Sequence, residues 1–235
     1  MKNQKSKIWK ITCIFLFFLL PAVAYPITVD QLFQHLQKKY ASLKDLRASF
    51  SQSTVFQSLG TSNRQEIKGE GVFYLKRPHM MRWDYTEPEK QHIISDGKKI
   101  WVYLEEDQQV MVGSSASVLD KHLLSSFFMD TTQIKKEFNV NLEEENGQIK
   151  LTLIPKVIQP SLKSLHIWLK KPARHRYAQA LAGGKDYQII KVSTIDLYGN
   201  TTTIVFTKIL FNPGLPISLF CFSPPKGVEV IKMLH

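Results

Sequence analysis

Cysteine is scarce in this sequence, with two in 235 residues, Cys13 and Cys221. Cys13 lies in an N-terminal apolar segment that we expect to be removed, so the mature chain would keep one cysteine and form no internal disulfide. Its stability must therefore come from an apolar core. Cys13 is in the middle of that segment rather than at its end, so no cysteine is placed to accept a lipid.

A membrane-spanning run is also missing. The apolar stretch at residues 11–20 is roughly half the ~20 residues that a transmembrane helix needs. It has a positive flank before it and the small residues Ala22 and Ala24 after it, which together are typical of a secretory signal peptide. The flanking cations are Lys2, Lys5, Lys7 and Lys10. We expect cleavage between Ala24 and Tyr25 and an exported protein; an uncleaved N-terminal anchor is the alternative.

No Gly/Ser-rich or Pro-rich linker and no internal repeat divides the remaining chain. Residues 25–235 are enough for one good core, and all-β domains of roughly this size are commonly single. The formal charge is +11, and four of the positive residues fall in the signal segment, which leaves +7. A basic exported protein is suited to an acidic partner or an anionic membrane surface, and we expect no nucleic-acid partner.

Motifs for catalysis, metal binding and nucleotide binding are not found. The seven histidines show no HExxH or comparable ligand spacing, and there is no Walker pattern. The small residues at 113–117 lack the glycine that would complete a nucleophile elbow. A triad assembled in space can escape such inspection, but the sequence favours a protein that is not an enzyme and that has no cofactor, no metal and no catalytic residue.

What the sequence does contain is a series of short strands rich in aromatic residues. Apolar residues alternate with period two at 67–75, turns follow at Arg77-Pro78 and Glu87-Pro88, and Asp96-Gly97 makes a hairpin. Apolar groups fall on both parities, which a sheet packed on both sides would explain. Methionine beside tryptophan and tyrosine also suits a surface that meets ligands of varied outline. The side chains concerned are Phe73, Met81, Trp83, Tyr85, Trp101 and Tyr103.

Two helices are predicted among the strands. Thr28 and Gln31 have the spacing of a capping box, and the stripe that includes Leu32 and Leu36 follows. A second helix-like apolar set at 118–128 includes Leu123 and Phe127. The many hairpins imply a curved antiparallel sheet, and each helix must cover something with its apolar face, most simply the concave side. Either these stripes are ordinary core or a cavity lies between helices and sheet.

The order and spacing of several short motifs resemble the periplasmic outer-membrane lipoprotein carrier family (LolA). The resemblance covers essentially the whole mature chain, including Phe50-Ser51-Gln52. The motifs are Gly71-x-Phe73-x-Leu75-x-Arg77-Pro78, Arg82-Trp83-x-Tyr85-x-x-Pro88, Ser95-Asp96-Gly97, Trp101-x-Tyr103 and Phe222-x-Pro224-Pro225-x-Gly227-Val228.

The resemblance implies a fold of mainly β structure with helices, an incomplete antiparallel barrel with a helical lid over an apolar cavity. It implies a monomeric periplasmic chaperone that binds the acyl chains of lipoproteins. Its partners would be an inner-membrane lipoprotein-releasing ABC transporter and an outer-membrane lipoprotein receptor. A sensor or binding module of the same fold, for lipids or lipoproteins, is the alternative.

Site residues follow from the same resemblance. Arg77 matches an arginine that holds the lid shut, and Met81 stands where some members have a phenylalanine that takes up cargo. Trp101 or Tyr103 would line the cavity according to strand parity. The candidate acyl contacts are Met81, Trp83, Tyr85, Phe73, Trp101, Leu32, Leu36, Leu123 and Phe127. The basic segment at 170–184 departs from the family pattern; it is either a solvated loop or a contact with an acidic partner.

Overall fold

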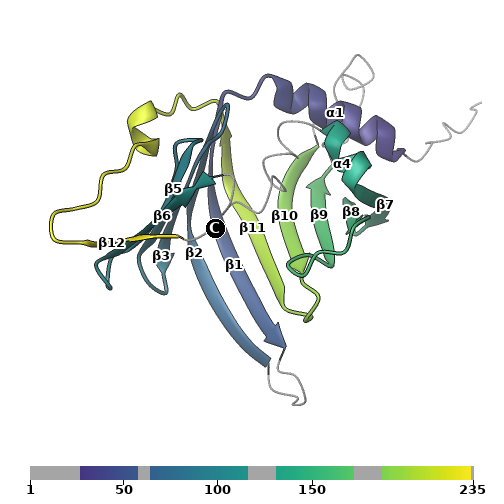
Figure 1. Ribbon diagram of the computed structural model, residues 1–235. Helices are drawn as coiled ribbons and strands as arrows, with labels where there is room; N and C mark the ends of the chain where they lie inside the picture. Colours follow the sequence, from purple (N-terminus) through teal and green to yellow (C-terminus); the bar gives the residue numbers. More distant parts are fainter. Residues whose placement is uncertain (1–26, 58–63, 116–130, 172–186, 234–235) are drawn as a thin grey trace, which may run out of the picture.

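The computed structural model describes residues 27–57, 64–115, 131–171 and 187–233. Their strands form one curved sheet with few helices, as the sequence predicted (Figure 1). The helical elements are α1 (Val29–Ala41), α4 (Thr131–Glu137) and the 3-10 turn η3 (Ile217–Phe220). The strands are β1 (Asp45–Gln57), β2 (Arg64–Lys76), β3 (Met80–Glu87), β4 (Gln91–Ser95), β5 (Lys99–Leu104), β6 (Gln109–Ser114), β7 (Phe138–Glu145), β8 (Gln148–Pro155), β9 (Ser164–Lys170), β10 (Gln188–Ile195), β11 (Thr201–Phe211) and β12 (Glu229–Lys232).

The strand order is β12-β6-β5-β4-β3-β2-β1-β11-β10-β9-β8-β7. Neighbours along the sheet are antiparallel, except that β12 pairs in parallel with β6. β1 joins the two halves because it pairs with β2 on one side and with β11, far away in sequence, on the other. The predicted hairpin at Asp96-Gly97 connects neighbouring strands of this sheet, and so do the glycine-containing turns at Asn146-Gly147 and Tyr198-Gly199.

Helix α1 begins as the capping-box spacing predicted. The Thr28 hydroxyl accepts a hydrogen bond from the Gln31 backbone N–H, and the Gln31 side chain accepts one from the Thr28 backbone N–H. The helix buries one face and contacts α4, which in turn contacts β7; both helices lie at one end of the strands in Figure 1. The second predicted helical set, at 118–128, lies outside the described residues. The apolar stripe of α1, which includes Leu32 and Leu36, is confirmed as part of the core.

β2 and β3 approach each other closely at Gly71. A side chain at Gly71 would place its Cβ 1.9 Å from the carbonyl oxygen of Asp84 on β3. The pairing register also shifts between Glu70 and Gly71. A glycine inside a strand is expected where another backbone comes this near.

The C-terminal segment, residues 212–228, was not predicted to pack on the far side of the sheet. The Leu219 carbonyl accepts a hydrogen bond from Arg82, and the Phe222 ring packs near Trp101 and Tyr103. At its start, the buried Asp45 carboxylate accepts backbone N–H groups of Gly214 and Leu215. The segment therefore covers the convex face of β3 to β5.

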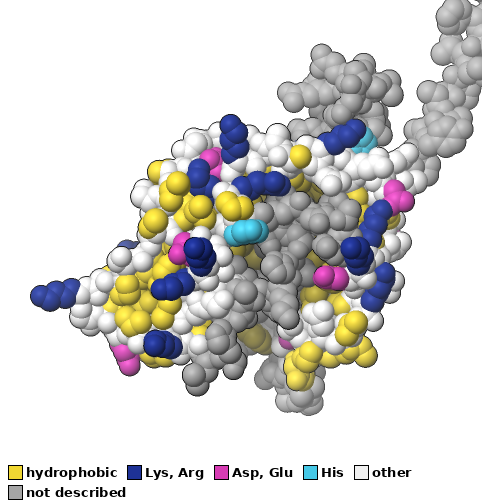
Figure 2. Space-filling model, turned by 45° about the horizontal axis from the view of Figure 1, so that its top comes forward, with side chains coloured by type: hydrophobic (Ala, Val, Ile, Leu, Met, Phe, Trp, Pro, Cys, Tyr) yellow, Lys and Arg dark blue, Asp and Glu magenta, His cyan; other side chains and the backbone are white. Residues whose placement is uncertain are grey.

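Charged side chains are spread over the face of the molecule that Figure 2 draws. On the face drawn in Figure 2, Lys and Arg side chains are scattered, with exposed hydrophobic side chains between them. A nucleic-acid interface is typically marked by a continuous basic patch or stripe. The face drawn in Figure 2 presents isolated cations instead.

Candidate functional site

The concave face of the sheet is apolar across its centre. Paired residues of an antiparallel ladder point to the same face, so the register assigns Ala48, Phe73 and Trp83 to one side. The Trp83 ring lies 4.3 Å from Phe73 and 4.9 Å from Phe50, centroid to centroid. This cluster continues into β8 to β11, whose buried members are Ile149, Leu151, Leu153, Leu165, Ile167, Leu169, Ile189, Val192 and Phe206.

Helix α1 covers part of this face. Leu32 and Leu36 have no exposed surface, and Tyr40 is 2 % exposed. Tyr40 and Phe73 help to line an apolar void of only about 10 Å³ between helix and sheet. Such a void is at the lower limit for a single water molecule, so among the described residues this void can take an acyl chain only after α1 and the sheet separate.

Arg77 joins the sheet to that helix. Its backbone N–H donates to the Lys44 carbonyl, and its guanidinium Nη2 donates to the Tyr40 carbonyl at 2.8 Å. Tyr40 is in the last turn of α1, the negative end of the helix dipole, where cations are attracted; its carbonyl also accepts the Leu43 backbone N–H. Arg77 on the sheet is therefore hydrogen-bonded to the C-terminal end of α1.

The structure brings together most of the predicted acyl contacts. Phe73, Trp83, Leu32 and Leu36 belong to the buried cluster, and Met81 and Tyr85 pack against it partly buried. Phe50 and Phe206 belong there as well; neither was among the predicted acyl contacts, although Phe50 continues the alternation of Leu46 and Ala48. Leu123 and Phe127 lie outside the described residues.

Trp101 is not on this face. It pairs with Ile94 and Val112, whereas Trp83 pairs with Ile93, and Ile93 pairs with Val102. Period-two alternation therefore turns the Trp101 side chain to the convex side, where its ring lies 6.2 Å from Phe222. Tyr103 is on the same convex side. Neither Trp101 nor Tyr103 therefore lines the concave face.

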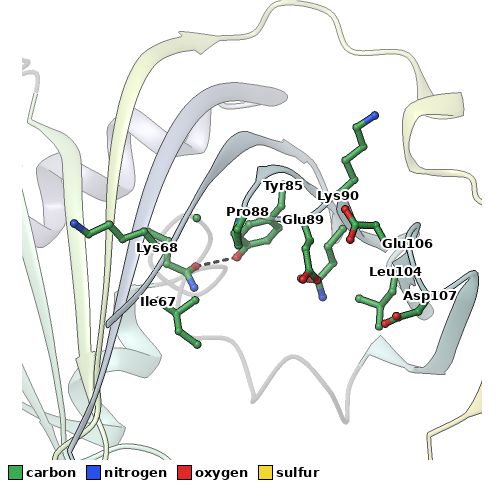
Figure 3. Close-up of a pocket in the computed structure, with 12 residues that line it drawn as sticks. Ile67, Lys68, Tyr85, Pro88, Glu89, Lys90, Leu104, Glu106 and Asp107 are labelled. Atoms are coloured by element: carbon green, nitrogen blue, oxygen red, sulfur yellow. Dashed lines mark hydrogen bonds between the residues drawn. The ribbon is translucent and has the colours of Figure 1, made fainter. Parts of the chain in front are cut away.

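Beyond the helix, a pocket of about 210 Å³ opens at the far end of β1 to β3. Figure 3 shows Tyr85 and Pro88 at its centre, with the Tyr85 hydroxyl donating to the Gln52 amide oxygen at 2.9 Å. Its lining residues are Gln52, Ile67, Lys68, Gly69, Tyr85, Pro88, Glu89, Lys90, Gln91, Leu104, Glu106 and Asp107. Burial raises the pKa of Tyr85, which therefore remains a protonated donor.

A charged cluster lies behind Trp83 on the convex face. His92 contacts Asp84 through Nδ1 at 2.6 Å and Glu105 through Nε2 at 2.7 Å, and Arg82 Nε donates to both oxygens of Asp84. The hydrogen bond to Asp84 raises the pKa of His92, against the opposing effect of burial. Burial acts to raise the pKa of Asp84, but the hydrogen bonds from His92 and Arg82 prevail and lower it.

This cluster predicts a pH-dependent stability. Because the folded protein raises the His92 pKa above 6.5, the stabilisation is complete below pH 6.5 and is lost as the pH rises through the folded value. As the pH rises from 6.5 through the pKa of His92 in the folded protein, we expect the free energy of unfolding of the wild type to fall more than that of His92→Gln. Urea unfolding of both proteins across the interval measures the difference, and parallel pH profiles would contradict it.

Among the described residues, no group of three or more His, Cys, Asp and Glu is arranged to hold a metal ion. No helix of the described ranges is both long and apolar enough to cross a bilayer.

Comparison with known proteins gives one consistent family. The model of the family described as outer membrane lipoprotein carrier protein LolA matches residues 41–223. The outer-membrane lipoprotein carrier protein of Dechloromonas aromatica is 28 % identical over 230 residues, which are 97 % of this chain and 98 % of that protein. The outer-membrane lipoprotein carrier protein of Legionella pneumophila (strain Lens) is 31 % identical over 199 residues, which are 84 % of this chain and 88 % of that protein. The crystal structure of a conserved protein from Thermus thermophilus aligns with 88 % of this chain over 100 % of its own length, with a TM-score of 0.53 and 11 % sequence identity. That protein therefore shares the fold.

Proposed function

This chain belongs to the outer membrane lipoprotein carrier (LolA) family, and from that membership we propose that it carries lipoproteins through the periplasm by enclosing their acyl chains. Residues 25–235 would act as a single monomeric domain after removal of the signal peptide. An inner-membrane ABC transporter would load the carrier, and an outer-membrane receptor would unload it. The role requires a cavity that opens and closes, and no catalytic group.

The observation that carries the proposal is the apolar concave face beneath α1. Four aromatic rings, from Phe50, Phe73, Trp83 and Phe206, pack together on this face in one buried cluster with the apolar residues of α1, and two of them, Phe73 and Phe206, line the small void beside Tyr40. If the helix moved away, this surface would be exposed in water, and a hydrocarbon chain would cover it. The acyl contacts that we propose are Leu32, Leu36, Phe73, Met81, Trp83 and Tyr85 of the described residues, together with Leu123 and Phe127.

Energetics explain why a carrier is needed. Each buried methylene contributes roughly 0.8 kcal/mol, so a chain of about 15 methylenes costs about 12 kcal/mol to leave in water. A lipoprotein with several such chains cannot cross an aqueous compartment unaided.

The same numbers limit how tightly the carrier can hold its cargo. Non-covalent affinities saturate near roughly 18 to 21 kcal/mol, and cargo held that firmly would not be released. Part of the transfer free energy must therefore be offset by separating α1 from the sheet, which exposes the residues that now pack against each other. A receptor can then bind the cargo more tightly than the carrier does.

A transfer assay tests the function. The mature protein is mixed with membrane vesicles that contain a radiolabelled lipoprotein and its releasing transporter. We expect a soluble one-to-one complex of lipoprotein and carrier after the vesicles are removed. If no complex forms while a carrier of known activity gives one in the same vesicles, the proposed function fails.

A further inference from the structure

The concave face changes from apolar to polar along a line that crosses several strands. On β1 the residues on this face are Leu46, Ala48 and Phe50, at most 4 % exposed, followed by Gln52 and Thr54, which are half-buried. On β11 the change falls between Ile204 and Thr202, and on β3 it falls between Trp83 and Tyr85. The β3 change lies opposite Ala48 and Phe50 of β1, and the β11 change lies opposite Gln52 and Thr54, so the line runs diagonally across the sheet.

The polar side chains on this line are joined by hydrogen bonds. The Tyr85 hydroxyl donates to the Gln52 amide oxygen at 2.9 Å, and the Gln52 amide nitrogen lies 3.4 Å from the Thr54 hydroxyl. The Thr54 and Thr202 hydroxyls are 3.2 Å apart. We call these four residues, Gln52, Thr54, Tyr85 and Thr202, the polar belt. It links strands that are distant in the sequence.

A missing side chain allows the belt to cross β2. Gly69 pairs with Gln52, and a Cβ on Gly69 would lie 3.2 Å from the Tyr85 ring. The Tyr85 hydroxyl therefore reaches over the bare backbone of β2 to Gln52. The pocket of about 210 Å³ begins at this point and is lined by Gln52, Gly69 and Tyr85.

The belt has hydrogen-bond donors left for a ligand. A primary amide carries two N–H groups, and Gln52 directs one of them to Thr54. Of the Thr54 and Thr202 hydroxyls, one donates its hydrogen to the other. The hydroxyl that accepts keeps its own hydrogen for a ligand. The matching ligand group is one that only accepts, such as the carbonyl oxygen of an ester or an amide.

The lipid anchor of a lipoprotein contains such groups between its hydrocarbon chains and its cysteine. We propose that the polar belt binds the ester and amide carbonyls of the anchor while the chains lie along the Trp83 and Phe50 side of the same face. This inference rests on the proposed function. Neighbouring residues on one face of a strand are about 6.6 Å apart, so a chain that ends beside Phe50 places its carbonyl near Gln52.

The test compares two synthetic triacylated lipopeptides, one with its two natural ester links and one with ether links in their place. The hydrocarbon chains are the same, but the ether probe lacks two carbonyl oxygens. We expect the wild type to bind the ester probe about tenfold more tightly, as one or two hydrogen bonds would give. Gln52→Leu and Thr202→Val should bring that ratio close to one.

Thr203→Val is the matched control, because Thr203 is next to Thr202 on β11 but bonds to Ser193 on the convex face. It should keep the wild-type ratio. An unchanged ratio in Thr202→Val, or in Gln52→Leu, would overturn the role of the belt while leaving the carrier function in place. If the wild type binds neither probe, the proposed function fails and the role of the belt fails with it.

Discussion

Arg77→Leu is expected to take up lipoprotein normally and to fail in passing it on. The wild-type guanidinium donates to the Tyr40 carbonyl at the end of α1, and this bond must break when the helix leaves the sheet. A hydrogen bond to a charged group contributes about 1.5 to 3 kcal/mol. Without it, opening costs less, so cargo affinity should rise by about 10- to 100-fold. Transfer to the receptor should fall because the carrier regains less on closing.

Arg47→Leu is the control for charge and size. Arg47 is on β1 with its guanidinium over the Tyr74 ring on the convex side, and the bonds that the structure gives it do not involve α1. The measurements are release of labelled lipoprotein from vesicles and its subsequent incorporation into receptor-containing membranes. Normal onward transfer by Arg77→Leu would exclude the latch role.

Gly71→Ala is expected to destabilise the protein strongly, and much more than the same change at Gly69. The added Cβ would lie 1.9 Å from the Asp84 carbonyl oxygen, and backbone atoms on both strands would have to move. Overpacking of this kind costs about 3 kcal/mol or more. At the size of this chain, that loss lowers the melting temperature by about 6 to 12 °C.

Gly69→Ala, two residues earlier on the same face, gives the comparison. Its Cβ would be 3.2 Å from the Tyr85 ring and from the Glu87 carbonyl oxygen, so a shift of a few tenths of an ångström is enough. Alanine also removes part of the entropic cost of glycine in a strand, about 0.5 to 1 kcal/mol. We expect a change within about 1 kcal/mol. Equal thermal stability of the two variants would contradict the close approach at Gly71.

Local features of the fold could be read from the sequence because neighbouring residues determine them. The capping box at Thr28 begins α1, and Asp96-Gly97 and Asn146-Gly147 make hairpins. α4 was missed because it is short, and the strand that the Asn146-Gly147 hairpin requires before it, β7, ends in an acidic run at 143–145 that by itself resembles a solvated loop. Parallel pairing of β12 with β6 has no local signal at all.

The candidate site was only partly predictable for a different reason. Arg77 and the apolar residues around Trp83 stand out in a single stretch of sequence. The strands there have apolar residues on both faces, however, so the sequence does not show which face meets the helix. The side on which Trp83 and Trp101 fall depends on what covers each face, and the C-terminal segment covers the one that holds Trp101. No pattern in the sequence indicated that Gln52 and Thr202 belong to one hydrogen-bonded group, because only the sheet brings them together.

By itself, the sequence determined the curved antiparallel sheet, its capped helix and its lack of catalytic motifs, because turn chemistry, capping and alternation act over a few residues. Only the tertiary structure decided which face meets α1, where Arg77 finds a helix carbonyl, and where the apolar face becomes polar. These depend on the pairing of β1 with β11, strands separated by more than a hundred residues, whose register no local pattern specifies.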